Sequence, residues 1–354
     1  MKLSNFDKNQ FNKLGQQRTD NKTKPKNTSD KTLKGKGSKI NPEKTGNWAK
    51  RKTISSVLLL NLITVAEKKS RNPKIIKSYR NAYYCLNEVE TSGNKLFGKY
   101  CKNRHCLNCA AIRKAELINK YLPIVKQWKD PQLVTLTIKA IPAKNLKKFM
   151  KEGMVKAIKR IIARYRKRSY RNDSKPMIGI RALECNFNPQ KRTYNPHYHL
   201  IVSDLETAKN LVKDWMALWT NKHTGIYSQN IRPVKDTTKD LIEVIKYGTK
   251  IFTDPTMKKG RNKKTPHFVY VSAIDNILNA MIGIRQFEHF GFKIPKQNKV
   301  KFDPEIAEEL KQWQFDLRKA DWTDIESDDN SLSGHSLDPN TQNTLENNIN
   351  LDLE

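Results

Sequence analysis

The chain has 354 residues, which is long enough for one large domain or two small ones with a buried core. Its 68 Lys and Arg residues face only 35 Asp and Glu residues, and the formal net charge of +33 favours a polyanionic partner such as nucleic acid. The sequence shows no secretory signal and no apolar run of membrane-spanning length, because residues 54–66 are too few and are flanked by charge. We therefore expect a cytoplasmic protein without a membrane role.

The two ends of the chain differ from its middle in composition. Residues 1–52 are rich in Lys, Asn, Thr, Ser and Gly and hold almost no large apolar side chains, so we predict a disordered basic arm. Residues 321–354 contain no Lys or Arg and many Asp and Asn, which predicts a disordered acidic tail. Between them we expect a Cys-rich module ending in a helix over 53–130, an α+β domain over 131–296 and a C-terminal helix over 297–320.

Hydrophobic periodicity predicts alternating helices and strands through the middle of the chain. Residues 132–138 alternate apolar side chains with threonines, as a strand does, and residues 145–170 read as a long basic amphipathic helix. The remaining predicted elements are strands over 177–187 and 193–203 and helices over 116–128, 206–220 and 238–252. Antiparallel strands interleaved with helices indicate an α+β fold, with a central antiparallel sheet flanked by helices.

Four of the five cysteines lie close together in the sequence, in the pattern Cys101-x4-Cys106-x2-Cys109 with Cys85 sixteen residues upstream of Cys101. In a chain without an export signal, this favours a metal site or free thiols over disulfides. Four thiolates can form a tetrahedral zinc site, and His105 is an alternative to one of them. Free buried thiols are the other interpretation.

Two histidines stand one residue apart within the strand predicted over 193–203. Because side chains alternate along a strand, His197 and His199 share one face and can chelate one divalent cation. If the hairpin turns at residues 190–191, Glu184 of the preceding strand falls opposite His197. We expect this cluster on a sheet face outside the core. The alternative is two partly exposed histidines on an ordinary strand.

A second group of polar residues lies on the helix predicted over 238–252. Glu243 and Tyr247 are four residues apart and share one face, and Lys246 and Lys250 are one turn apart on its flank. These side chains suit phosphodiester chemistry, in which tyrosine attacks a metal-polarised phosphate, lysine offsets the charge and glutamate activates water. An ordinary helix with a polar contact and a half-buried tyrosine is the alternative.

In this order, the segments TLTI, PHYHLIV and EVIKYGTK resemble the three motifs of plasmid rolling-circle replication initiators. These proteins belong to the HUH endonuclease superfamily, and the match is to the branch that pairs one tyrosine with an upstream glutamate. The resemblance covers roughly residues 83–293, including the Cys-rich segment. It implies an HUH-type catalytic domain over 131–296, beside a small zinc-stapled module.

The resemblance also implies roles for residues at matching positions. His197 and His199 would bind the metal. Tyr247 would nick one strand at the double-strand origin, leaving a 5′-phosphotyrosine and a free 3′-OH that primes synthesis. Glu243 would act as general base at the second cleavage, so that water releases the enzyme from the DNA.

The third metal ligand is not fixed by the resemblance. Strand parity favours Glu184, while Asn186 and residues of the TLTI segment remain competitors. The mixed imidazole and carboxylate ligands suit Mg²⁺ or Mn²⁺, and Lys246 or Lys250 would stabilise the tyrosine phenolate. We expect the basic helix over 145–170 to help hold the DNA strand open at the nick.

The implied partners are plasmid DNA, as duplex at the origin and as single strand at the nick, together with the host helicase and replication machinery. The oligomeric state stays open, with a homodimer as one option. Two alternatives remain: an HUH relaxase or transposase, and a non-catalytic zinc-dependent DNA-binding regulator. The regulator would keep the charge and the cysteines but would have no use for Tyr247.

Overall fold

A computed structural model describes residues 37–219, 223–249, 267–295, 310–327 and 330–336. The contacts divide the chain into two compact units. Unit 1 comprises residues 1–53, 86–99 and 299–354, and unit 2 comprises residues 54–85 and 100–298. The first boundary falls inside the long helix α2 (Pro42–Lys68). In the described part of the chain, the helices are all too short or too polar to cross a lipid bilayer.

Unit 1 contains an antiparallel five-stranded sheet in the order β1-β3-β2-β10-β11. Its core includes Trp322, which is fully buried and donates its indole N–H to the carbonyl of Leu86 at 2.7 Å. Trp313 likewise donates to the hydroxyl of Thr91 at 2.9 Å. The strands are β1 (Ser38–Lys39), β2 (Glu88–Ser92), β3 (Lys95–Gly98), β10 (Lys311–Asp316) and β11 (Asp321–Asp324).

The C-terminal part of unit 1 differs from two predictions. A helix over 297–320 is wrong for the described residues, because β10 occupies 311–316, where buried Trp313 and Phe315 alternate with polar residues as a strand requires. A disordered tail from residue 321 is also wrong at its start. The carboxylate of Asp321 is buried and accepts hydrogen bonds from the amide and hydroxyl of Ser333 at 3.0 and 2.7 Å.

The disordered arm predicted over 1–52 is wrong from residue 38 onward, since β1 pairs with β3 there and α2 begins at residue 42. The side chain of Asn41 accepts a hydrogen bond from the amide of Lys44 at 3.3 Å, and Pro42 occupies the first turn. Asn followed by Pro is a start signal for a helix, and the polar composition of the segment obscured it. Residues 1–36 lie outside the described residues.

Unit 2 is built on a six-stranded antiparallel sheet in the order β8-β4-β7-β6-β9, with β5 pairing with β7. The strands are β4 (Gln132–Thr137), β5 (Ile141–Pro142), β6 (Gly179–Asn188), β7 (Thr193–Val202), β8 (Asn230–Pro233) and β9 (Phe287–Phe290). Four helices flank it, namely α4 (Leu107–Val125), α6 (Val155–Tyr170), α7 (Leu205–Leu218) and α8 (Thr237–Thr249). The predicted α+β fold, with an antiparallel sheet between helices, is therefore confirmed.

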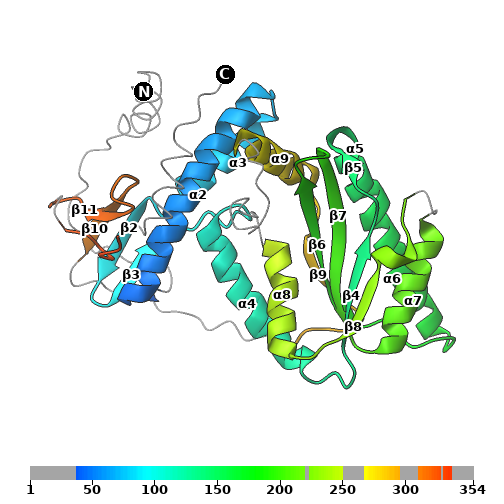
Figure 1. Ribbon diagram of the computed structural model, residues 1–354. Coiled ribbons are helices and arrows are strands. Elements are labelled where there is room, and N and C mark those ends of the chain that lie inside the picture. The colour runs from blue at the N-terminus through cyan, green and yellow to red at the C-terminus, as the bar shows by residue number, and fades with distance from the viewer. Residues whose placement is uncertain (1–36, 220–222, 250–266, 296–309, 328–329, 337–354) are drawn as a thin grey trace. The chain divides into compact units, whose positions relative to one another are not determined.

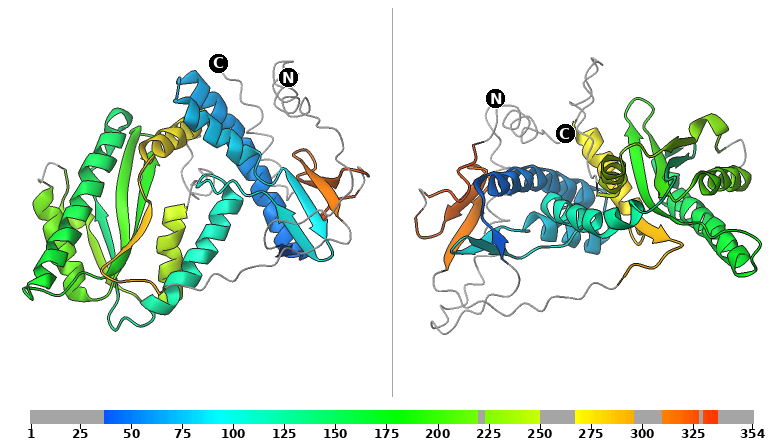
Figure 2. Two further views of the ribbon diagram at one scale, coloured as in Figure 1. Left: turned by 180° about the vertical axis from the view of Figure 1, so that it is seen from behind. Right: turned by 90° about the horizontal axis from the view of Figure 1, so that it is seen from below.

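Helices cover both faces of this sheet, with α6 and α7 on one side and α4 and α8 on the other (Figures 1 and 2). Tyr198 and Leu200 of β7 pack into a core with α6 and α7. Ile201, on the opposite face, packs with Tyr121 of α4 and Val244 of α8. The expectation that the histidine face of the sheet lies outside the core is therefore wrong. The face is polar only towards the end that carries the histidines.

The helix predicted over 145–170 is a continuous helical segment with a π-helical turn in its middle. It runs as α5 (Ala143–Lys148), the π turn Phe149–Met154 and α6. A Cβ atom at Gly153 would clash with the Trp219 ring at 2.7 Å. The π turn thus places glycine, which has no side chain, at the point where the backbone meets that indole. Because α6 covers the sheet face opposite to the histidines, it does not line the candidate cleavage site.

A buried ionic cluster fixes α9 (His267–Ala280) to the segments around α3 (Pro73–Tyr83). The carboxylate of Asp275 is fully buried and pairs with Lys69 at 3.1 Å and Arg71 at 2.9 Å. It also accepts a hydrogen bond from the hydroxyl of Tyr79 at 3.2 Å. Two cations and a phenol thus compensate one buried charge, and they connect the segment before Cys85 to α9, the helix that follows α8 in the chain.

Candidate functional site

The hairpin of β6 and β7 brings a carboxylate to the two histidines. Glu184 pairs with His197 in the strand register, which confirms the hairpin geometry predicted from strand parity. The Oε2 atom of Glu184 lies 3.3 Å from Nε2 of His197 and 3.3 Å from Nε2 of His199. The three potential ligand atoms lie within 4.8 Å of one another. Two imidazole nitrogens and a carboxylate oxygen at such spacing fit one divalent cation.

The surroundings orient these side chains for metal binding. The Nδ1 atom of His197 lies 2.9 Å from the carbonyl of Asn195 and donates a hydrogen bond to it, which leaves Nε2 turned towards Glu184. The hydroxyl of Thr135 lies 3.5 Å from Nδ1 of His199. Burial raises the pKa of Glu184, but the neighbouring imidazoles of His197 and His199 outweigh it and lower that pKa to about 2. The carboxylate is therefore ionised at neutral pH, as a metal ligand requires.

Two competitors for the third ligand position, Asn186 and Thr137, are exposed or hydrogen-bonded elsewhere. Asn186 pairs with Asn195, one row beyond the histidines on the side facing solvent, and its side chain is exposed. Thr137 pairs with His197, but its hydroxyl donates to the carbonyl of Ser228 at 3.0 Å. Within the described residues, Glu184 is the carboxylate that joins the two histidines.

Helix α8 carries the second predicted group of residues. Its start is fixed by Asp236, whose carboxylate accepts hydrogen bonds from the amides of Thr238 and Lys239 at 2.9 and 3.0 Å. The N-cap of α8 is therefore Asp236. Buried Leu241, Val244 and Ile245 hold the helix against the sheet.

Of the candidate residues on this helix, the structure describes the side chain of Glu243 alone. Glu243 is half exposed, and its Oε2 lies 3.6 Å from the guanidinium of Arg232 in β8. Lys246 and Tyr247 lie within α8, and only their backbone is described. Lys250 lies outside the described residues.

The path of α8 nevertheless bears on Tyr247. The helix follows Pro233, which pairs with Gln132, and it runs beside the sheet from that end (Figure 1). Val244 and Ile245, which precede Tyr247 in the helix, pack in one cluster with Ala182 and Ile201 on the histidine face of the sheet.

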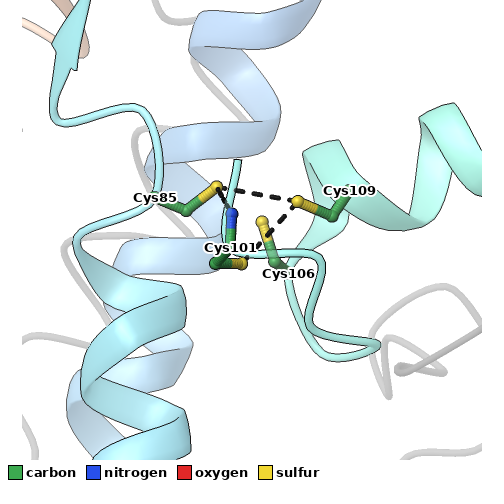
Figure 3. A group of neighbouring side chains, drawn as sticks. All are labelled: Cys85, Cys101, Cys106 and Cys109. Carbon is green, nitrogen blue, oxygen red and sulfur yellow. Dashed lines mark hydrogen bonds between the residues drawn. The ribbon is translucent and has the colours of Figure 1, made fainter. Parts of the chain in front are cut away.

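The four clustered cysteines converge in unit 2 (Figure 3). Cys85 follows α3, Cys101 lies in the loop before α4, Cys106 is the N-cap of α4 and Cys109 lies in its first turn. The Sγ atom of Cys109 is 3.7 Å from those of Cys85 and Cys101. A zinc ion with ~2.3 Å bonds to four sulfurs would set them about 3.8 Å apart, whereas disulfide sulfurs are ~2.05 Å apart. The spacing therefore fits a tetrahedral metal site and excludes disulfides.

The surroundings of the sulfurs also suit thiolates. The backbone amides of Cys101 and Asn103 donate to the Sγ atoms of Cys85 and Cys101 at 3.3 and 3.4 Å. Hydrogen bonds from Cys101, Cys109 and Cys85 hold the pKa of the Cys106 thiol well below its usual range, whereas hydrogen bonds within the cluster and burial raise the pKa of the Cys85 and Cys109 thiols. Four thiolates would therefore need a bound cation. His105 does not join the cluster, because its ring lies edge-on against Tyr79 with Nε2 3.3 Å from the hydroxyl of Ser78.

A basic cavity of about 490 Å³ lies beside the cysteine loop. Two of its cations hold the protein together: Arg104 donates to the carbonyls of Met281 and Ile284 at 3.3 Å, and Arg113 donates to that of Lys102 at 2.6 Å. The lining residues include Lys74, Ser78, Lys102, Arg104, His105 and Arg113. The two arginines therefore have a structural role, whereas Lys74 and Lys102 are exposed to solvent at the cavity.

Sequence reasoning missed the supporting residues of the site. Arg232 pairs with Asp240 at 2.6 Å and reaches Glu243, yet it precedes α8 on a short edge strand. Thr135 supports His199 from a neighbouring strand. One signal was available for Thr135, since the TLTI alternation puts both of its threonines on one face. The position of Arg232 depends on pairing between β8 and β4, which no local pattern specifies.

Comparison with known proteins gives one family. The profile of a family described as replication protein matches residues 95–331. A protein named Protein rep from Staphylococcus aureus is 27% identical over 166 residues, covering 42% of this chain and 69% of the relative. The protein of the same name from a Bacillus species is 27% identical over 171 residues, covering 45% and 53%. That from Streptococcus pneumoniae is 25% identical over 230 residues, covering 58% and 68%. The match thus spans about two thirds of the first relative and about half of the second. No solved structure is detectably similar to the chain.

Proposed function

The chain belongs to the replication protein family, and from this premise we propose that it initiates plasmid rolling-circle replication by nicking one DNA strand at the double-strand origin. The observation that carries the proposal is the convergence of Glu184, His197 and His199 on the sheet face against which α8 packs. The net charge of +33 supports a DNA substrate.

In the proposed reaction, the phenolate oxygen of Tyr247 attacks the phosphorus of the scissile diester. The bond from phosphorus to the 3′ oxygen breaks, which leaves a 5′-phosphotyrosine and a 3′ oxygen that takes up a proton to become the primer hydroxyl. A free tyrosine has a pKa of about 10, so its phenolate needs nearby positive charge, for which we propose Lys246 or Lys250. A Mg²⁺ or Mn²⁺ ion held by Glu184 and the histidines would polarise the scissile phosphate.

For the cysteine cluster we propose a structural Zn²⁺ bound by Cys85, Cys101, Cys106 and Cys109. Four protein ligands close the coordination sphere, which suits a structural role rather than catalysis. The ion would fix the loop of residues 101–106 between α3 and α4, and with it the basic cavity. We propose that this cavity contributes to the duplex affinity of the protein.

A direct test is the incubation of a supercoiled plasmid carrying the cognate origin with the protein and Mn²⁺ or Mg²⁺. We expect one nicked strand and a covalent protein–DNA adduct that survives denaturation. A plasmid without the origin and a reaction with excess chelator serve as controls. Binding to the origin without any nick in either metal would instead identify a non-catalytic DNA-binding regulator.

The third metal ligand can be tested with two neighbouring substitutions on one strand. Glu184→Ala removes a buried carboxylate of the metal group and should reduce nicking about a hundredfold or more, because the cation is held more weakly. Asn186→Ala, two residues along the same face, removes an exposed amide outside the group and should leave the rate within about twofold. The measurement is the initial nicking rate as a function of Mn²⁺ concentration. Equal rates for the two variants would contradict the assignment of Glu184.

Glu243 is expected to act after the first cleavage. Glu243→Ala should still nick, while the release of closed monomeric circles falls about a hundredfold or more, because no carboxylate directs water at the second cleavage. The half-exposed position of this side chain fits a group that handles water. The circles and the longer products can be counted by gel electrophoresis of a replication or strand-transfer reaction. Unaltered release of monomeric circles would contradict the base role.

A further inference from the structure

A short turn with two exposed hydrophobic side chains lies beside the metal-binding row of the sheet. It comprises Ile226–Ser228, a single 3₁₀ turn that precedes β8. The hydroxyl of Thr137 donates to the carbonyl of Ser228 at 3.0 Å. Thr137 is the strand partner of His197, and paired residues of adjacent strands point to the same face. The turn is therefore attached to the row that carries His197 and Glu184.

Polar contacts hold this turn in place. The amide of Thr137 donates to Oε1 of Gln229 at 2.9 Å, and the hydroxyl of Thr224 donates to the carbonyl of Thr137 at 2.9 Å. The side-chain amide of Gln229 donates to the hydroxyl of Thr224 at 2.8 Å and to the carbonyl of Gly225 at 3.0 Å. The turn is thus fixed to β4 from both of its ends, without burying the two hydrophobic side chains at its tip.

Those two side chains face solvent. Tyr227 is 102% exposed and Ile226 is 55% exposed. Among the large hydrophobic residues that the structure describes, Tyr227 is the most exposed, followed by Tyr170 at 83%. An aromatic ring presented to water on a hydrogen-bonded turn contributes nothing to the core and is accessible to a bound molecule.

We infer that Tyr227, with Ile226 beside it, is a stacking platform for an unpaired base of the DNA strand that enters the cleavage site. This inference rests on the proposed function. A strand that reaches the row of His197 and Glu184 must be unpaired there, because paired bases stay stacked within the duplex. Unpaired bases stack on aromatic side chains irrespective of their sequence. Tyr227 would then fix the position of the strand along the active site, while other groups read its sequence.

The chain offers a matched control for this tyrosine. Tyr170 is also highly exposed, but it ends α6, which covers the opposite face of the sheet. Substitution of Tyr170 therefore removes an exposed phenol of the same kind at a place that the cleaved strand does not reach.

Binding is measured in a Tyr247→Phe background, where the DNA is not consumed. The probe is a fluorescently labelled single-stranded oligonucleotide containing the nick sequence of the origin. We expect Tyr227→Ala to weaken its binding about tenfold, Tyr227→Phe to weaken it less than about twofold, and Tyr170→Ala to leave it unchanged. In the Tyr227→Trp protein, the new indole fluorescence should be quenched when an unlabelled oligonucleotide is added. Binding of duplex origin DNA should change less than about twofold in all variants.

Several outcomes would overturn the inference. They are unchanged single-strand binding by Tyr227→Ala, an equal loss in Tyr170→Ala, the absence of quenching, or an equal loss of duplex binding. The last outcome would assign the turn to a duplex or protein contact. The result is independent of the nicking assay: quenching by single-stranded DNA in a protein that never nicks would retain the platform and reject the proposed function.

Discussion

Replacing Tyr247 by phenylalanine is expected to abolish the covalent protein–DNA adduct and to reduce nicking by about four orders of magnitude or more. The substitution removes the oxygen that would attack phosphorus, while the ring and its place on α8 are kept. Origin binding should persist, because it depends on the basic surface and not on one phenol. The measurement is adduct formation on end-labelled origin DNA under denaturing conditions, together with a binding assay on the same preparation.

Tyr170→Phe is the matched control, since it removes a phenol from the opposite face of the sheet and should nick normally. Peptide mapping of the wild-type adduct should place the DNA on the segment that contains Tyr247. An adduct on another tyrosine, or normal nicking by Tyr247→Phe, would reject this residue as the nucleophile. Failure of wild-type nicking as well would reject the enzymatic proposal as a whole.

Loss of the metal at the cysteine cluster is expected to have the largest effect on stability. Cys106→Ser should lose the single bound zinc per chain and lower the free energy of unfolding by about 3 kcal/mol or more. The ion would hold together two helices and a loop, and without it the four sulfurs keep only weak hydrogen bonds. Zinc content by mass spectrometry and thermal unfolding by circular dichroism measure the two effects.

Cys185 provides the control for this experiment. It is buried on the core face of β6, outside the cluster, and its Sγ contacts the carbonyl of Asn186 at 3.9 Å. Cys185→Ala should keep one zinc per chain and lose stability only through the smaller side chain. Absence of zinc from the purified wild-type protein, or equal zinc content in Cys106→Ser, would show that the cluster is a group of free thiols.

The two candidate metal sites are expected to differ in how readily a chelator removes their metals. The group of Glu184, His197 and His199 has three ligands and suits exchangeable Mg²⁺ or Mn²⁺. Four thiolates bind zinc far more tightly, and the cluster is largely buried. A mild chelator should therefore stop nicking reversibly before it removes zinc.

The sequence by itself determined the local parts of the site. Strand alternation put His197 and His199 on one face, and the hairpin register put Glu184 opposite them, because a strand repeats every two residues whatever surrounds it. Helical periodicity likewise put Glu243 and Tyr247 on one face of α8. The spacing of the four cysteines was enough to predict a shared metal site.

Only the tertiary structure decided what surrounds those parts. Helices α4 and α8 cover the face that strand alternation left open, and β10 and β11 join a sheet with β2, more than 200 residues earlier in the chain. The turn that carries Tyr227 reaches the row of His197 through Thr137, a strand away. These contacts depend on pairing and packing between distant segments. Such contacts produce no periodic pattern of residues in either segment alone. Periodicity within one element is therefore readable from the sequence, whereas the choice of its neighbours is not.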